Sequence, residues 1–260
     1  MADLVTGEKA FPSAGLPTPE SVLLDTDWPS LWHAYGPAVD VPAQLPALFS
    51  DDPHAREAAL QFLFGTLHHQ GTLYEATVPA ALYVASILRD PRTNLVADQR
   101  LPLRAELLAW IASVGQTASD DLEDARRENR FPLDDYPQAV DIRKMRPLLF
   151  TTAFDLTDDP DRRIREAAIA ACIPLVDDPQ LQHHRTALVP LVRQVLGTSE
   201  LWQHRERAID ALDAWGEDSS GLEGQQNPFE FCDSDLPPTG TSVWSAGPWS
   251  STSDTGGPPF

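Results

Sequence analysis

The stretch Asp51-Asp52-Pro53-His54-Ala55-Arg56-Glu57-Ala58-Ala59-Leu60 returns in altered form later in the chain. A second Asp-Asp-Pro, at 158–160, precedes Arg165-Glu166-Ala167-Ala168-Ile169, and Arg205-Glu206-Arg207-Ala208-Ile209 is a third copy. A turn signal followed by an arginine and a small-residue helical run, repeated within one chain, is typical of α-helical repeat proteins. In such proteins each unit is stabilised by stacking on its neighbours, and the stack usually serves to bind partners.

Apolar residues at helical spacing predict an all-α chain. Asp52 is expected to cap a helix whose first residue is Pro53, because its carboxylate can accept orphan backbone N–H groups. Pro174 is expected to kink or end its helix. The predicted helices cover residues 28–35, 40–49, 53–69, 76–89, 101–115, 138–156, 161–176, 184–197 and 200–215.

The arginines at 56, 104, 165 and 205 set the predicted domain organisation. Their intervals approach the ~40–47 residues of helix-pair repeats, except for the interval that contains an acidic segment at 116–141. We interpret that segment as an insertion on the binding face, with a solvated acidic loop as the alternative. The repeat region then covers 28–215, between a flexible N-terminal arm at 1–27 and a disordered acidic tail at 216–260.

The charge balance limits the class of partner. There are 19 basic and 39 acidic residues, a formal net charge of −20. A nucleic-acid partner is not expected, because such proteins need a basic footprint. A basic protein surface is an easier partner, although solubility alone is an alternative reason for the charge. No segment has the ~20 apolar residues of a membrane span, no signal peptide is evident, and two cysteines fit a reducing compartment, so we expect a cytoplasmic protein.

The segments around Asp52 and Asp159 resemble HEAT repeats, which carry an Asp at the turn within each repeat and an Arg early in the second helix. The resemblance implies a right-handed, armadillo-like α–α superhelix of about four helix-pair repeats with disordered termini. It also implies that Asp52 with Arg56, and Asp159 with Arg165, form a structural ladder between stacked units. The second spacing is two residues longer, so its turn is expected to differ.

A narrower likeness covers about residues 33–90. Tyr35-Gly36-Pro37-Ala38 and the segment from His69 to Thr77 resemble a group of bacterial HEAT-repeat proteins without an assigned activity. This resemblance implies a fold and leaves the activity open.

The turn around Gly71 holds the candidate binding residues His69, Gln70, Tyr74 and Glu75. These polar side chains could bind a ligand, and a purely structural turn between helices is the alternative. Adjacent histidines such as His68 and His69 point ~100° apart on a helix, which is not the i, i+4 pattern of a zinc site. We therefore expect no metal and no cofactor.

Two classes of function fit the sequence. The first is a non-enzymatic scaffold that binds a protein or peptide on its concave helical surface, for example as an inhibitor or immunity-type partner of a basic protein. The second is a HEAT-like lyase or another enzyme with a pocket on that face. No Gly-rich phosphate loop, zinc motif or nucleophile elbow is present, and we therefore favour the scaffold and predict no catalytic residues.

Overall fold

The structure, a computed structural model, describes residues 15–94, 101–120 and 136–222. The core of the predicted acidic insertion, most of the tail and the first half of the N-terminal arm therefore lie outside the described residues. In the described part the chain is mostly α-helical, as predicted. No helix described there is long and apolar enough to cross a membrane.

From residue 53 onward the α-helices follow the predicted order with shifted ends. The α-helices are α1 (Pro19–Asp25), α2 (Val41–Gln44), α3 (Pro53–Phe62), α4 (Thr77–Ile87), α5 (Leu103–Thr117), α7 (Pro137–Phe154), α8 (Arg162–Leu175), α9 (Arg185–Leu191) and α10 (Trp202–Ala214). One-turn 3-10 helices occupy 28–30, 46–49, 69–71, 91–94 and 182–184. Short π-helical turns at 63–67 and 192–196 extend α3 and α9.

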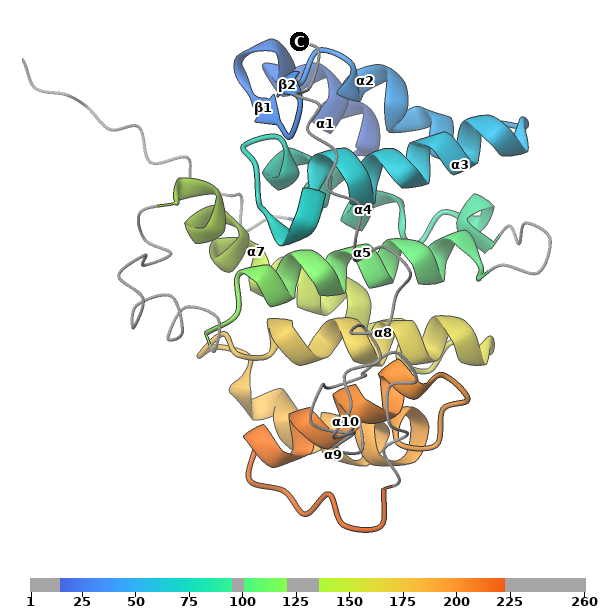
Figure 1. Ribbon diagram of the computed structural model, residues 1–260, viewed down its shortest axis with the longest axis vertical. Coiled ribbons are helices and arrows are strands. Elements are labelled where there is room, and N and C mark those ends of the chain that lie inside the picture. Colours follow the sequence, from blue (N-terminus) through green and yellow to red (C-terminus); the bar gives the residue numbers. More distant parts are fainter. Residues whose placement is uncertain (1–14, 95–100, 121–135, 223–260) are drawn as a thin grey trace, which may run out of the picture. The chain divides into compact units, whose positions relative to one another are not determined.

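Helices lie in successive layers within residues 15–222 (Figure 1). Helix α5 lies beside α8, and α7 packs on both of them. Helix α10 packs on the far side of α8 together with the π-turn that follows α9. At Gly115 of α5, an added Cβ would lie 3.1 Å from Leu175 Cδ2, so α5 and α8 approach closely there.

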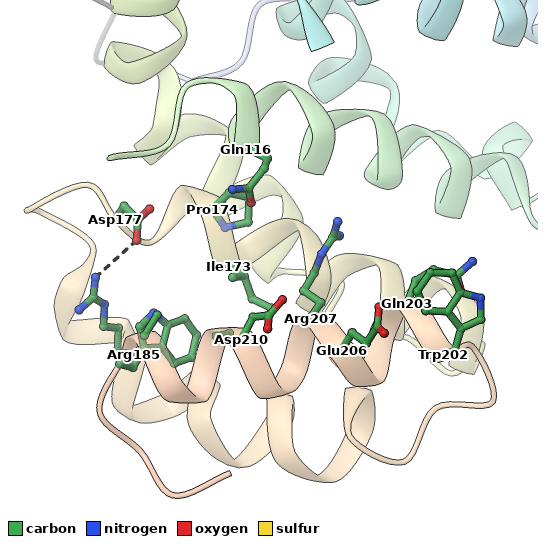
Figure 2. Close-up of a pocket in the computed structure, with 13 residues that line it drawn as sticks. Gln116, Ile173, Pro174, Asp177, Arg185, Trp202, Gln203, Glu206, Arg207 and Asp210 are labelled. Atoms are coloured by element: carbon green, nitrogen blue, oxygen red, sulfur yellow. Dashed lines mark hydrogen bonds and ion pairs between the residues drawn. The ribbon is translucent and has the colours of Figure 1, made fainter. Parts of the chain in front are cut away.

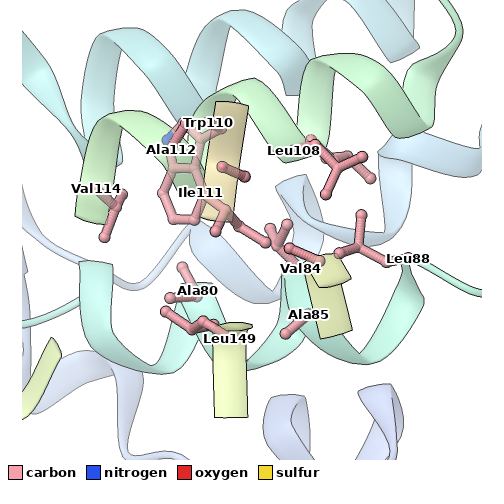
Figure 3. Close-up of a cluster of buried hydrophobic side chains, with 14 of the residues drawn as sticks. Ala80, Val84, Ala85, Leu88, Leu108, Trp110, Ile111, Ala112, Val114 and Leu149 are labelled. Carbon is pink, nitrogen blue, oxygen red and sulfur yellow. The ribbon is translucent and has the colours of Figure 1, made fainter. Parts of the chain in front are cut away.

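Two buried apolar clusters meet at α8, because this helix has neighbours on both sides. Ala168, Ala171 and Cys172 belong to a large cluster that joins α1, α4, α5 and α7. Ile169 and Ala170 belong to a smaller cluster with residues of α10 and of the 192–196 turn. The small-residue run after Arg165 thus lets a single helix pack on both sides. Figure 3 shows the centre of the large cluster, where α4 and α5 contribute most of the labelled side chains.

The first copy of the repeated stretch begins α3 with a specific set of bonds. Asp52 is the N-cap, as predicted: its carboxylate accepts from the amide of His54 at 3.0 Å, and Pro53 follows as the first helical residue. Two residues earlier, the Ser50 hydroxyl accepts from the Asp52 amide at 3.2 Å. The Ser50 carbonyl accepts from Arg56 Nη1 at 2.5 Å. Arg56 therefore closes the turn that leads into its own helix.

Helices α8 and α10 begin in the same way. In each, the backbone amide of the N-cap residue donates to the side chain of the residue two positions earlier. The arginine at the fourth helical position donates to the backbone carbonyl of that same earlier residue. The equivalents of Ser50, Asp52 and Arg56 are Asp159, Asp161 and Arg165 in α8, and Ser199, Leu201 and Arg205 in α10. Asp159 thus corresponds to Ser50 and not to Asp52, which explains the spacing that is two residues longer.

The predicted helix at 28–35 is wrong. Residues 28–30 make one 3-10 turn, and β1 (Trp32–His33) then pairs antiparallel with β2 (Gly36–Pro37). Gly36 has φ +143°, a value that favours glycine, and the proline after it cannot donate a helical bond. The hairpin is also anchored from outside, because the Ala76 amide donates to the Trp32 carbonyl at 3.1 Å.

Three further predictions need correction. The helix expected at 40–49 is split at Pro46, which has no amide to donate. Residues 19–25, which we placed in a flexible arm, form α1 with Val22 buried. The start of the predicted tail is also ordered, since Leu222 packs beside the smaller apolar cluster.

His68 is buried between the end of α3 and α5. Its Nε2 lies 2.8 Å from Thr117 Oγ1 and its Nδ1 3.2 Å from Ser113 Oγ. Burial lowers the pKa of His68 to about 4. In the unfolded chain its pKa is ~6.5, so between these two pKa values the unfolded state binds more protons than the folded state.

We therefore expect acid to destabilise the protein through His68. Between pH 6.5 and pH 4 this residue should lower the free energy of unfolding by up to about 3 kcal/mol. The measurement is urea unfolding of the wild type and of His68→Gln across this pH range. The two proteins share all other titrating groups, so the difference between their pH dependences gives the contribution of His68. Equal pH slopes for the two proteins would contradict the assignment.

Candidate functional site

The four predicted binding residues bond to different parts of the chain, and the Tyr74 amide donates to Thr77 Oγ1 at 2.8 Å. His69 Nδ1 lies 3.0 Å from the Gly65 carbonyl, and its ring lies 5.5 Å from that of the exposed Tyr35. Gln70 takes a left-handed backbone conformation with φ +50° and is exposed. Glu75 bonds elsewhere: its Oε2 accepts from the Trp32 amide at 2.9 Å. These contacts join the hairpin to the turn, which fits the structural alternative.

Glu75 also lines a cavity of about 410 Å³ between α1, α4 and α7. Asp25, Asp27 and Asp141 share its rim, and Leu31 and Val78 are among its apolar residues. Within the described ranges, no three His, Cys, Asp or Glu side chains are placed to hold a metal ion.

A larger cavity, of about 550 Å³, runs along α10, and we call it the α10 groove. One continuous face of α10 lines it, over more than three helical turns, opposite the ends of α5 and α8 (Figure 2). Its lining residues are Gln116, Ile173, Pro174, Asp177, Arg185, Trp202, Gln203, Glu206, Arg207, Asp210, Ala211, Ala214 and Trp215.

Arg207 extends from α10 into the middle of this groove, toward the side of Gln116 (Figure 2). Among the described residues, no acceptor bonds to its guanidinium. Burial lowers the pKa of Arg207, and the negative charge of Asp210 opposes that shift. The side chain is half-buried and its guanidinium nitrogens remain accessible to solvent, so a carboxylate brought by a ligand could replace water there with charge-assisted hydrogen bonds.

The second arginine of the groove is already paired. Arg185 Nη2 lies 3.4 Å from Asp177 Oδ1, as the dashed line in Figure 2 marks, and its guanidinium lies over the Trp215 ring at 5.9 Å. Its Nε is buried and finds no hydrogen-bond partner in the described part of the chain. Arg185 therefore forms one wall of the groove, while Arg207 presents the available positive charge.

Glu166 holds the start of α10 against α8. Its Oε2 accepts from Ser199 Oγ at 2.9 Å and lies 3.4 Å from His204 Nδ1, and its Oε1 accepts from Arg162 Nε at 2.7 Å. Burial lowers the pKa of His204, and the Glu166 carboxylate partly opposes this. Because Glu166 is itself buried, these bonds fix the first turn of α10 and so the wall of the groove.

Arg207 was not among the predicted site residues, although it departs from the other repeated stretches. In the three repeated stretches, Ala58 and Ala167 occupy the position that Arg207 takes in the third. Ala167 is buried in α8 whereas Ala58 is exposed, so the residue type at this position does not by itself indicate whether the helix face is covered.

Comparisons with protein-family models, curated proteins and solved structures found no match for this chain. The resemblance to HEAT repeats therefore stays a prediction, and the candidate site depends on its geometry.

Proposed function

We propose that this chain is a non-enzymatic protein-interaction scaffold, and that the α10 groove holds an extended segment of a partner protein. The observation that carries the proposal is the face of α10 that lines the groove, with an arginine at its centre for which the described residues supply no acceptor. The groove also has aromatic side chains near both ends, Trp202 and Trp215. Such residues are enriched in binding sites, because they supply a large contact area at low conformational-entropy cost.

A HEAT-like stack of helix pairs is the fold that we infer to present this groove. The shared helix start of α3, α8 and α10 supports a common repeated unit, as does the packing of α5 beside α8 and of α8 beside α10. The groove lies between α10 and the ends of α5 and α8, so a segment bound there would contact more than one layer of the stack.

The partner is expected to be basic overall. The net charge of −20 would speed its approach through long-range attraction, and this acceleration should weaken as salt is added. A role as an inhibitor or immunity-type partner of a basic protein is a specific form of this proposal. This long-range attraction acts on the whole partner protein, whereas the groove contacts a single segment of it.

Filling the groove should abolish peptide binding. Ala214 lines the groove and is exposed, so Ala214→Trp would obstruct it without disturbing the core. Peptides selected from a random library against the full chain should lose at least about tenfold in affinity, measured by fluorescence anisotropy, which corresponds to ~1.4 kcal/mol. Ala43→Trp, at an exposed alanine of α2, is the matched control and should change affinity less than about twofold.

Selected peptides that bind Ala214→Trp as tightly as the wild type would place the binding surface elsewhere. In that case the α10 groove would not be the functional site.

A further inference from the structure

We propose that Arg207 anchors the carboxylate of an aspartate or glutamate side chain inside the docked segment of the partner. This inference rests on the proposed function, and it specifies the chemistry that the groove recognises. The partner protein would thus be basic overall, while the segment in the groove carries one acidic residue opposite Arg207.

The first argument is the unmet bonding capacity of Arg207. A guanidinium has five N–H donors in a planar fork that matches a carboxylate with two parallel bonds. In the described residues none of these donors has an acceptor, and the side chain is half-buried in the groove wall. A carboxylate would supply both the missing acceptors and the opposite charge.

The second argument concerns the position of Arg207 along the groove. Lining residues continue on both sides of it, to Trp202 in one direction and to Ala214 in the other. At ~1.5 Å per residue, this face of α10 is ~18 Å long, which matches five or six residues of an extended peptide at ~3.3 Å each. Arg207 then lies beside the third residue, so the chain of the ligand continues past it. An internal side chain fits this position better than a chain end.

The third argument is that the groove has room for a single acidic side chain. Asp177 already pairs with Arg185, and Glu206 and Asp210 line the groove on either side of Arg207 along α10. A second carboxylate in the ligand would meet these negative charges and be repelled. The groove should therefore prefer one acidic residue at a fixed position with uncharged or basic neighbours.

The test is a double-mutant cycle with the full chain. Hexapeptides from the library selection are synthesised with acetylated and amidated ends, and the shared acidic residue is replaced by its amide. We expect the amide peptide to bind the wild type at least tenfold more weakly than the acidic peptide does. For Arg207→Met the two peptides should differ in affinity by less than twofold. Arg207→Lys, which keeps the charge and loses the fork, should give an intermediate effect.

Arg89→Met is the matched control, because it removes one exposed guanidinium far along the sequence from the groove. It should leave the effect of the amide replacement unchanged. Arg207→Gln replaces the Met variant if thermal unfolding shows that the Met variant is not folded.

The outcomes separate the two proposals. If Ala214→Trp blocks binding but the amide replacement costs the same in wild type and Arg207→Met, the groove binds peptides and the carboxylate anchor is refuted. If selected peptides bind solely with a free C-terminal carboxylate, the carboxylate that Arg207 binds comes from the chain end, and the proposed internal side chain is refuted. If no selected peptide depends on the groove, both proposals fail.

Discussion

Replacing Trp110 with alanine is expected to lower the free energy of unfolding by about 4 kcal/mol. Trp110 is fully buried in α5, at the centre of the large apolar cluster (Figure 3). Its indole Nε1 donates to the Leu63 carbonyl at 2.9 Å. The substitution removes the largest side-chain volume of this region and leaves a cavity between α4 and α5 that rigid helices cannot collapse to fill.

Urea unfolding followed by far-UV circular dichroism measures this loss. Trp110→Phe should cost less, since it keeps most of the ring and loses the hydrogen bond; the Leu63 carbonyl keeps the bond from the His68 amide at 3.1 Å. Trp32→Ala is the matched control, because Trp32 is 57% exposed, and it should change stability by less than about 1 kcal/mol. Equal losses for Trp110 and Trp32 would contradict the assignment of the core.

The helices α3 and α5 could be predicted from the sequence because nearby residues decide where they begin and end. The apolar spacing around Trp110 places α5 within two residues at each end, and the Asp-Pro signal places the start of α3 at Pro53. Local patterns failed where distant residues decide. Trp28, Leu31 and Tyr35 have helical spacing, yet the hairpin there is held by bonds to the turn before α4.

The candidate site was harder to predict than the fold. His69 and Glu75 were singled out by residue type, and the structure shows them bonding to different partners near the hairpin. Arg207 was read as part of a repeated stretch. Its significance lies in what surrounds it in space, namely a cavity and the lack of an acceptor among the residues that the structure describes, and neither can be deduced from sequence spacing.

The ladder implied by the HEAT resemblance stays a prediction, and the two arginines assigned to it, Arg56 and Arg165, bond within their own turns. The ion pair that joins the start of α5 to the turn before α8 is formed by Arg104 and Asp159, with 3.4 Å between Nη1 and Oδ2. Both side chains are nearly buried, at 9% and 11% exposure. Arg104 also donates to Thr93 Oγ1 at 2.9 Å and to the Asp90 carbonyl at 3.2 Å.

Arg104→Met should therefore cost about 3 kcal/mol in unfolding free energy, because it leaves the Asp159 carboxylate buried without its cation. Adding Asp159→Asn should restore at least half of that loss: the amide oxygen can still accept from the Asp161 amide, now 2.9 Å from Oδ1, and no buried charge remains. The Asp90 carbonyl keeps the bonds from Thr93, so the methionine leaves no carbonyl there unsatisfied. Arg89→Met, which breaks an exposed pair, should cost less than about 0.5 kcal/mol. Additive losses in the double variant would show that the stability comes from packing of the arginine stem and not from charge pairing between the layers.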